Sequence, residues 1–540
     1  MKKLVSKFMA VLMAMTMILS MCTTAFAVEA QKGTLTVNNT VAGKTLDLYQ
    51  IFTATKSGDN VAYTLNSAYE RFFKDNTRIS GSESLTGEAL SEAAYNYVKT
   101  QVGTDGSKGA TFAKDILGWI LSASGETKTA VEATHSTATT ADTKTVIDNL
   151  AYGYYVVYPL GATDTSTAPG NESVKSVASL VSVTGTDATV NMKSNYPTVV
   201  KKVNDNKNAD DVNIGDTVTY TLTSKVPDMT GYTSYVFNFK DTLSAGLTFN
   251  EITSVTVGET IIAKVDAGQE ANDTYTLTQN GQNITITMNN FLASNANKVG
   301  QEIKVTYTAT LNKDAVTGFD ANKNSATVEY SNKPGTDNKG ESEPSIVDVH
   351  TFNFTIFKYY LKDAAKTGLA NAEFELYKAN GEVAGDKVNI KKATDGEYRV
   401  ATPEEAAAEG FKSDIIISGT NGKVLVKGLE AGTYYLRETK APEGYNKLLS
   451  DIKVVIEPVY DTTTGKLTSY SVDYTYNGTT TPGTAITNKT DSPEVPVENK
   501  TGAQLPSTGS KGALMVTLAG IVLFGALTVS KVFAKKKENK

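Results

Sequence analysis

Hydrophobic and polar residues alternate along much of the first 190 residues, which is typical of half-buried β-strands. The pattern predicts strands at 33–37, 46–52, 150–157 and 180–183, and two helical stretches, near residues 85–102 and 110–122, follow the second strand. We therefore predict a mainly β first domain with added helices, which spans residues 28–193.

Two further domains are expected from the same alternation. A second domain, residues 194–348, has its strands at 199–203, 217–224, 284–288, 303–311 and 326–330. The last of these strands is followed by the turn residues Asn332 to Gly335 and by a polar connector at 336–344. A third domain, residues 349–490, opens with the alternating stretch 352–358 and is expected to close at 485–489. Residues 491–504, with Pro493 and Pro496, are predicted to form a stiff spacer.

The two ends carry export and sorting patterns. Three lysines precede an apolar run at 8–19, and small residues around Ala27 supply a cleavage site, so residues 1–27 are predicted to be a secretory signal peptide. The single cysteine, Cys22, lies inside it, and the mature chain is therefore expected to contain neither thiols nor disulfides.

At the other end, a polar pentapeptide at 505–509 precedes an apolar stretch at 512–530 and a basic tail. The apolar stretch is just long enough to cross a bilayer, so residues 505–540 predict a sorting signal with a transmembrane helix.

Composition narrows the class of protein. The chain has 540 residues, a formal net charge of −6, two histidines and one tryptophan, with no basic cluster outside the terminal signals. This argues against nucleic-acid binding. No residues have metal-ligand spacing, and neither a nucleophile elbow nor a phosphate loop is present. We expect no metal, no cofactor and no enzymatic turnover.

The pentapeptide Leu505-Pro506-Ser507-Thr508-Gly509 resembles the LPxTG signal of Gram-positive surface proteins, which a sortase cleaves between Thr and Gly. The resemblance implies cleavage between Thr508 and Gly509. It also implies transient membrane anchoring, followed by covalent attachment of the secreted chain to peptidoglycan at the cell wall.

The third domain contains a second motif. Residues 434–445, YYLRETKAPEGY, resemble the E-box of Gram-positive pilins and collagen-adhesin B-type domains. In that family a Lys and an Asn join spontaneously as an isopeptide bond, assisted by the Glu; the resemblance assigns Lys358, Asn488 and Glu438. The chemistry requires a neutral amine, which burial favours, and a carboxyl group that polarises the amide and moves protons.

The second domain resembles the related A-type, in which Asp replaces Glu. The segment 239–249, FKDTLSAGLTF, supplies Asp241, and the closing strand supplies Asn324, with Asn322 and Asn332 as competitors. Period-two alternation places Val199, Lys201 and Val203 on one face, which favours Lys201 over Lys202 as the amine.

No strand lysine occupies the corresponding position in the first domain, so we predict no cross-link there, although Lys44 stays a candidate. Between the first two domains, residues 190–197 resemble a degenerate pilin motif, whose lysine accepts the Thr of the next subunit. Lys193 occupies that position.

These motifs together resemble a major backbone pilin, the shaft subunit of a sortase-assembled fimbrium. The resemblance implies three tandem immunoglobulin-like β-sandwich domains and, as partners, a sortase, further copies of the chain and peptidoglycan. An alternative is a monomeric wall-anchored adhesin that binds a host or matrix ligand. A surface enzyme is disfavoured because no catalytic cluster is visible.

Overall fold

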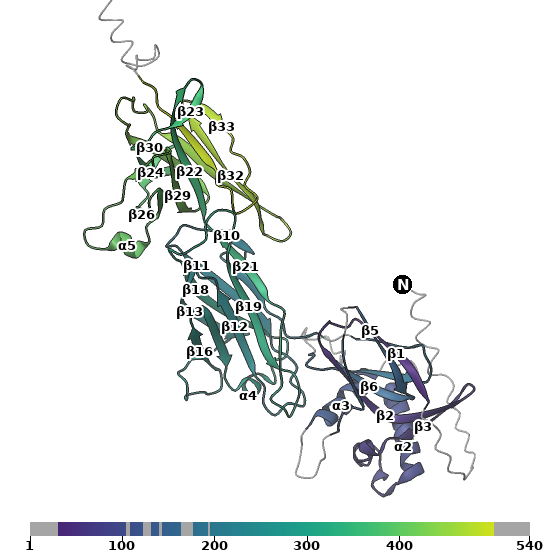
Figure 1. Ribbon diagram of the computed structural model, residues 1–540. Coiled ribbons are helices and arrows are strands. Elements are labelled where there is room, and N and C mark those ends of the chain that lie inside the picture. The colour runs from purple at the N-terminus through teal and green to yellow at the C-terminus, as the bar shows by residue number, and fades with distance from the viewer. Residues whose placement is uncertain are drawn as a thin grey trace, which may run out of the picture. The chain divides into compact units, whose positions relative to one another are not determined.

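The computed structural model describes residues 31–103, 109–122, 131–139, 143–163, 177–192 and 195–501 (Figure 1). The chain divides into two compact units, which we describe separately. One comprises Met1–Asp210, Thr217–Thr310 and Asn322–Val349; the other comprises Asp211–Asp216, Leu311–Ala321 and His350–Lys540. Strands dominate both, so the predicted mainly β fold, built from several β-sandwich domains, is confirmed.

The first domain, in the first unit, contains two sheets. One has the strand order β3-β2-β6-β7 with β4 beside β2, and the other has the order β5-β1-β8. The strands are β1 (Lys32–Asn38), β2 (Thr45–Ser57), β3 (Asn60–Leu65), β4 (His135–Ala138), β5 (Lys144–Ala151), β6 (Gly153–Pro159), β7 (Ser179–Val183) and β8 (Ala188–Asn191). The strand expected at 150–157 is in fact two, because the chain turns at Tyr152.

Both predicted helices of this domain are present, as α2 (Gly87–Val102) and α3 (Gly109–Leu121). Short helical turns precede them: η2 (Ser67–Tyr69), α1 (Glu70–Phe73) and η3 (Ser82–Ser84). Helix α2 buries Leu90, Ala94 and Val98, which recur every four residues on one face. It ends at Gly103, whose φ of 75° suits glycine.

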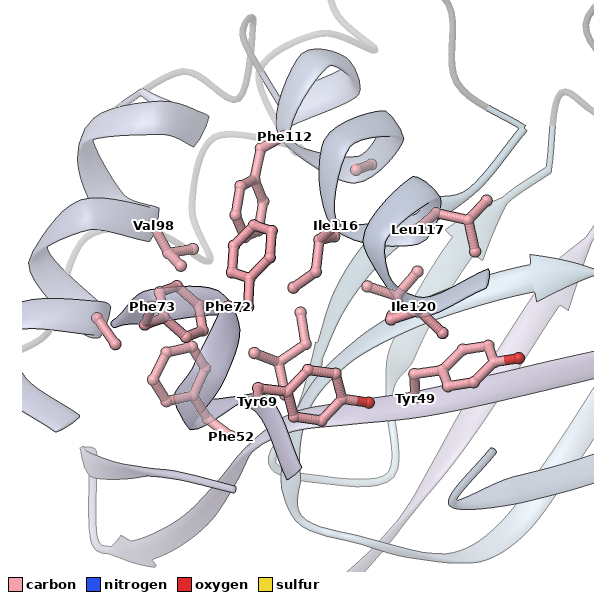
Figure 2. Close-up of a cluster of buried hydrophobic side chains, with 14 of the residues drawn as sticks. Tyr49, Phe52, Tyr69, Phe72, Phe73, Val98, Phe112, Ile116, Leu117 and Ile120 are labelled. Atoms are coloured by element: carbon pink, nitrogen blue, oxygen red, sulfur yellow. The ribbon is translucent and has the colours of Figure 1, made fainter. Parts of the chain in front are cut away.

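Aromatic side chains fill the space between these helices and strand β2 (Figure 2). Phe72 and Phe73 meet edge to face with ring centroids 5.0 Å apart, and Trp119 lies 5.4 Å from Phe72. Phe52 of β2 packs against Phe73 at 6.0 Å. The added helices therefore extend the core of the first domain.

The second domain, most of which lies in the first unit, is a sandwich of an eight-stranded and a five-stranded sheet. The larger sheet has the order β10-β21-β19-β12-β17-β16-β15 with β20 beside β19, and the smaller has the order β14-β13-β18-β11-β9. Its elements are β9 (Val200–Val203), β10 (Ala209–Asp211), β11 (Thr217–Lys225), β12 (Phe237–Leu243), β13 (Leu247–Val257), β14 (Thr260–Ile261), β15 (Ala263–Lys264), β16 (Thr274–Asn280), β17 (Asn283–Met288), α4 (Phe291–Asn295), β18 (Glu302–Leu311), β19 (Asn322–Ser331), β20 (Lys339–Glu341) and β21 (Ser345–His350).

The third domain, in the second unit, is a sandwich of six and seven strands. The first sheet has the order β23-β22-β29-β27-β26 with β34 beside β22, and the second has the order β25-β24-β30-β31-β32-β33 with β28 beside β24. Its elements are β22 (Phe352–Lys362), β23 (Ala365–Gly368), β24 (Glu373–Asn380), β25 (Val383–Lys387), β26 (Ile390–Thr394), β27 (Glu397–Val400), α5 (Pro403–Ala407), β28 (Ile416–Ile417), β29 (Lys423–Leu429), β30 (Gly432–Lys440), β31 (Ile452–Tyr460), β32 (Leu467–Tyr476), β33 (Thr479–Thr481) and β34 (Glu494–Glu498).

The end of this domain differs from the expectation. Residues 485–489 form no strand, and only Ile486 makes an isolated bridge, to Tyr470. The closing strand is β34, which lies inside the predicted spacer 491–504 and pairs in parallel with β22. Val495 and Val497 are buried, so the alternation of valine with Glu and Pro that resembled a spacer is that of a core strand.

Within the described residues, no helix is long and apolar enough to cross a membrane. The predicted signal peptide, the apolar stretch 512–530 and its transmembrane helix lie outside the described residues.

Candidate cross-linking sites

Three of the predicted residues of the second domain meet in the core of its sandwich. Lys201 lies on β9 of the five-stranded sheet, whereas Asp241 and Asn324 lie on adjacent strands β12 and β19 of the eight-stranded sheet. Asp241 is opposite Ala326 in the ladder, so Asn324 is its diagonal neighbour on the same face. All three side chains are at most 1% exposed.

The contacts in this cluster run through a fourth residue, Tyr307 of β18. The Lys201 ammonium contacts Asp241 Oδ2, and Nζ also donates to the Tyr307 hydroxyl at 2.6 Å. Tyr307 in turn donates to Asp241 Oδ2 at 2.7 Å, and Asn324 Nδ2 donates to the same hydroxyl at 2.7 Å. The amine, the carboxylate and the amide are thus linked by one phenol.

Burial controls the charge of the lysine. It lowers the pKa of Lys201 from 10.5 to about 8, although Asp241 acts in the opposite direction by favouring the ammonium form. Burial and the nearby Asp241 both raise the pKa of Tyr307, which therefore keeps its proton. A nucleophilic neutral amine is accordingly easier to reach at Lys201 than at an exposed lysine.

The alternatives left open by the sequence lie elsewhere. Lys202 points away from the cluster, and its Nζ donates to Asn208 Oδ1 at 2.6 Å. Asn322 is buried, but its amide donates to the Val349 carbonyl at 3.2 Å. Of the five candidates, the structure brings to Asp241 the lysine that the alternation favoured, Lys201, and the asparagine that the family resemblance suggested, Asn324. The other three, Lys202, Asn322 and Asn332, lie outside the cluster.

The third domain has a second buried lysine. Lys358 of β22 lies 2.8 Å from Glu438 Oε1 of β30, and both side chains are fully buried. Burial lowers the pKa of Lys358 to about 8, against the opposing effect of Glu438. Lys201 and Lys358 are the only buried lysines in the part of the chain that the structure describes.

The asparagine that lies beside the buried pair of the third domain is Asn499, whereas the predicted Asn488 lies outside the cluster. Asn488 is exposed and bonds to Asp491 and Thr490 in a local turn. Asn499 directly follows β34, is 2% exposed, and donates from Nδ2 to Glu438 Oε2 at 3.2 Å. Both asparagines precede a lysine, so the Asn-Lys pair could not separate them. The alternating residues before Asn499 were the available signal.

Local structure holds this asparagine in place. The Asn499 backbone N–H donates to the Tyr359 carbonyl at 2.9 Å, which continues the pairing of β34 with β22 beyond Lys358. The segment after the E-box strand supplies further contacts, because the Asn446 carbonyl accepts from Asn499 Nδ2 at 2.9 Å and the Leu448 N–H donates to Glu438 Oε2 at 2.7 Å. The segment that directly follows the E-box therefore orients the E-box carboxylate and the amide together.

A glycine makes room beside the lysine. Gly422 has a φ of +77°, and a Cβ there would lie 2.1 Å from the Lys358 carbonyl oxygen. The Lys358 N–H donates to the Gly422 carbonyl at 2.8 Å, so the backbone of Lys358 is hydrogen-bonded to Gly422 as well as packed closely against it.

The two clusters share one chemical arrangement: a buried amine, a carboxyl group and a buried amide. Asn324 Oδ1, Asn499 Oδ1 and Asp241 Oδ1 have no hydrogen-bond partner within the described residues. A buried unpaired oxygen is costly, and a carboxyl group that carries a proton could donate it to an amide oxygen. Such a bond would polarise the amide carbon for attack by the lysine. No group of metal-ligating side chains occurs in the described residues.

Three of the remaining predicted site residues, Lys193, Thr508 and Gly509, lie outside the described residues. In the first domain, Lys44 is half-buried, and its backbone N–H is bound to Thr139 Oγ1 at 3.0 Å.

Comparison with known families matches three parts of the chain. A model described as Gram-positive pilin backbone subunit 2, Cna-B-like domain, matches residues 214–334. A prealbumin-like fold domain matches residues 356–470, and an LPXTG cell wall anchor motif matches residues 497–540. The model that matches residues 214–334 is described as Cna-B-like, whereas we predicted from Asp241 that the second domain is of the A-type. The assignment of the second domain to the A-type stays a prediction.

Two curated proteins are similar to the chain. The trypsin-resistant surface T6 protein of Streptococcus pyogenes is 24% identical over 316 residues, which cover 52% of this chain and 50% of the relative. The fimbrial subunit type 2 of Actinomyces naeslundii is 26% identical over 373 residues, which cover 66% of this chain and 63% of the relative. The chain thus matches between half and two thirds of the length of these relatives.

Among solved structures, the T6 backbone pilin of Streptococcus pyogenes has a TM-score of 0.45 at 17% identity, covering 88% of this chain and 99% of that one. The group B streptococcus pilus 2b backbone protein has a TM-score of 0.39 at 25% identity, covering 57% and 99%. The family models and the curated relatives confirm the resemblance predicted from the sequence: the chain is similar to the backbone pilins of Gram-positive bacteria and carries their LPXTG cell wall anchor motif.

Proposed function

We propose that this chain is the shaft subunit of a covalent, sortase-assembled pilus on the cell wall. In each subunit Lys201 is joined to Asn324 and Lys358 to Asn499, with Asp241 and Glu438 as the assisting groups. In each bond the lysine Nζ replaces the amide nitrogen of the asparagine, which leaves as ammonia. The protein acts as a structural element, and the only chemistry assigned to it is this single self-modification.

One observation carries this proposal: two successive domains each bury a lysine against a carboxyl group and an asparagine. A buried lysine is rare unless it is paired, and breaking such a pair is costly. A covalent bond removes the cost of burying a charged lysine, since it replaces the ammonium by a neutral amide. The same bonds suit a fibre under tension, because they bypass hydrogen bonds that would otherwise carry the load.

We assign the acceptor group of assembly to the end of the first domain and the donor group to the sorting signal near the end of the chain. A sortase would cleave the Thr508–Gly509 bond and transfer the Thr508 acyl group to Lys193 Nζ of the next subunit. The final subunit would be transferred to peptidoglycan instead. The match of residues 497–540 to the anchor motif supports the donor, and the position of Lys193 between two domains supports the acceptor.

The ladder of covalent polymers on a denaturing gel tests this assembly. Lys193→Arg should abolish the ladder in wall extracts and leave secretion intact. Lys202→Arg is the matched control, because that lysine lies near the same junction but outside the cross-linking cluster, and it should leave the ladder unchanged. A ladder that persists in Lys193→Arg would reject Lys193 as the acceptor.

A monomeric wall-anchored adhesin is the second candidate. It would use the same sorting signal and the same internal bonds but no acceptor lysine, and it would bind a host or matrix ligand. Wall extracts would then contain a single band in both variants. Deleting residues 505–509 should in either case leave protein that detergent extracts.

A further inference from the structure

The two cross-linking clusters differ in how the carboxyl group reaches the amide. In the third domain Asn499 Nδ2 donates directly to Glu438 Oε2 at 3.2 Å. In the second domain the described hydrogen bond of Asn324 Nδ2 goes to the Tyr307 hydroxyl, and the hydroxyl itself donates to Asp241. In the second domain the Tyr307 hydroxyl thus lies between the carboxyl group and the amide, which contact each other directly in the third domain.

Tyr307 is held firmly in this position. Its ring stacks on Tyr220 of the adjacent strand β11 with centroids 5.2 Å apart, and Phe249 lies 5.7 Å away. Lys201 Nζ lies about equally far from both tyrosine rings, at 4.9 Å from Tyr220 and 5.0 Å from Tyr307. The hydroxyl of Tyr220 also interacts with Asn324, but it is not hydrogen-bonded to Lys201 or Asp241 among the described contacts. Of these two buried tyrosines, Tyr307 is therefore the one that joins the carboxyl group to the amide.

Formation of the bond requires Lys201 Nζ to lose two protons in turn and the amide nitrogen of Asn324 to gain one. The ammonium must lose a proton before it attacks, and the amide nitrogen of Asn324 must gain one before it can leave as ammonia. Asp241 contacts the amine, but the leaving nitrogen contacts Tyr307.

We propose that Tyr307 is a catalytic residue of the second-domain cross-link and carries a proton from Asp241 to the departing nitrogen of Asn324. The inference rests on the Lys201–Asn324 bond proposed above. Lys201 first gives a proton to Asp241, and its free amine attacks Cγ of Asn324 to form the new C–N bond. As the old C–Nδ2 bond breaks, Tyr307 protonates Nδ2 and is reprotonated by Asp241, which then accepts the second proton that Nζ loses as the new amide forms.

The proton count closes without a further reagent. The ammonium and the amide together bring five N–H hydrogens. One remains on the new amide, three leave with ammonia, and the fifth remains on Asp241 until it escapes to solvent. Burial keeps the phenol protonated, as this role requires, because ionisation of Tyr307 is disfavoured beside Asp241.

The test uses the chain from residue 31 to 501 made by in vitro synthesis, with samples quenched in denaturant over time. Digestion and mass spectrometry then measure the joined 201–324 peptides and, in the same molecule, the joined 358–499 peptides. Tyr307→Phe keeps the ring but removes the oxygen, and should slow the second-domain bond by about 100-fold or more. The third-domain bond should form at the wild-type rate and serves as the internal control.

Tyr220→Phe is the matched control, because it removes a buried hydroxyl that interacts with Asn324 but is not hydrogen-bonded to Asp241, and that hydroxyl therefore cannot pass on a proton from the carboxyl group. It should leave the rate nearly unchanged. Equal rates in wild type and Tyr307→Phe, or equal slowing by both variants, would overturn the role of Tyr307. If the second domain of Tyr307→Phe becomes sensitive to protease, fluorotyrosine at position 307 replaces the test: a more acidic phenol must alter the rate, and an unchanged rate overturns the proposal.

Failure of the underlying cross-link gives a different result. In that case the wild-type chain itself yields no joined 201–324 peptide, and Asp241→Asn changes nothing. A wild-type bond that Asp241→Asn abolishes, combined with a normal rate in Tyr307→Phe, rejects the relay alone.

Discussion

Replacing Asn499 by alanine should remove the third-domain cross-link and leave its strand pairing. Asn499 lies after β34 and contributes its side chain to Glu438, while the backbone contact to Tyr359 needs no side chain. Relative to its own sequence mass, the variant should therefore lack the loss of one ammonia that the third-domain bond causes in wild type. Asn488→Ala is the matched control, because that residue is exposed and removed from the lysine, and it should keep the bond.

The loss of stability can be worked from the length of the closed loop. A bond between Lys358 and Asn499 closes a loop of roughly 140 residues, and by analogy with disulfides it stabilises the domain by about 5 kcal/mol. For a domain of this size, each kcal/mol shifts the melting temperature by about 2–4 °C, which gives a decrease of about 10–20 °C. The buried amine of Lys358, now left beside Glu438 without its covalent partner, adds to this loss.

Calorimetry and intact mass on the same samples check both parts. Relative to their own sequence masses, wild type and Asn488→Ala should show the same loss of ammonia, and they should share one melting temperature for the third domain. Asn499→Ala should differ in both. The assignment of Asn499 is refuted if Asn488→Ala lacks the third-domain ammonia loss, or if Asn499→Ala still shows it. If Asn499→Ala lacks that loss but keeps the wild-type melting temperature, the loop-closure estimate is rejected and the assignment of Asn499 stands.

Three further predictions follow from single features. Asn324→Ala frees Lys201, whose pKa is lowered to about 8 by burial, while the unfolded chain titrates near 10.5. Between these pH values the unfolded state binds more protons than the folded state, so the free energy of unfolding of this variant should rise by about 3 kcal/mol relative to wild type from pH 8 to 10.5. If the difference in unfolding free energy between variant and wild type does not change with pH, the burial argument is contradicted. Gly422→Ala should destabilise the third domain in thermal unfolding, because the new Cβ would collide with the Lys358 carbonyl. Phe72→Ala should cost the first domain about 3–5 kcal/mol in denaturant unfolding, since a fully buried ring is lost.

Period-two alternation was the most reliable guide to the second-domain site. It placed Lys201 inward and Lys202 outward, and the structure agrees because β9 belongs to one sheet of the sandwich and turns alternate side chains toward the other sheet. The same alternation was available at 494–498, but two prolines nearby favoured a spacer. Pro496 is tolerated there because β34 pairs with a single neighbour, β22, among the described strands.

Tyr307 could not have been predicted. In the sequence it is one inward residue of a strand with buried valine and alanine on the same face, and nothing local marks it as different from Tyr330. Its polar role arises only when β18 of one sheet faces β12 and β19 of the other. The sequence led to Asn488 instead of Asn499 for a similar reason, because the asparagine that reaches the site depends on which strand closes the sheet beside Lys358.

The two cross-links differ in what they would protect when the chain is pulled from its ends. The third-domain bond joins β22 to the residue after β34, its neighbour in the same sheet, so force entering at Lys358 leaves at Asn499 and bypasses nearly the whole domain. The second-domain bond joins two different sheets and ends at Asn324, early in β19. Residues 325–349, which include β20 and β21, therefore lie outside the covalent loop and carry the load through their hydrogen bonds. Fully extended they span on the order of 80 Å, so extension under force should come first from this segment and stop where the bond at Asn324 takes the tension.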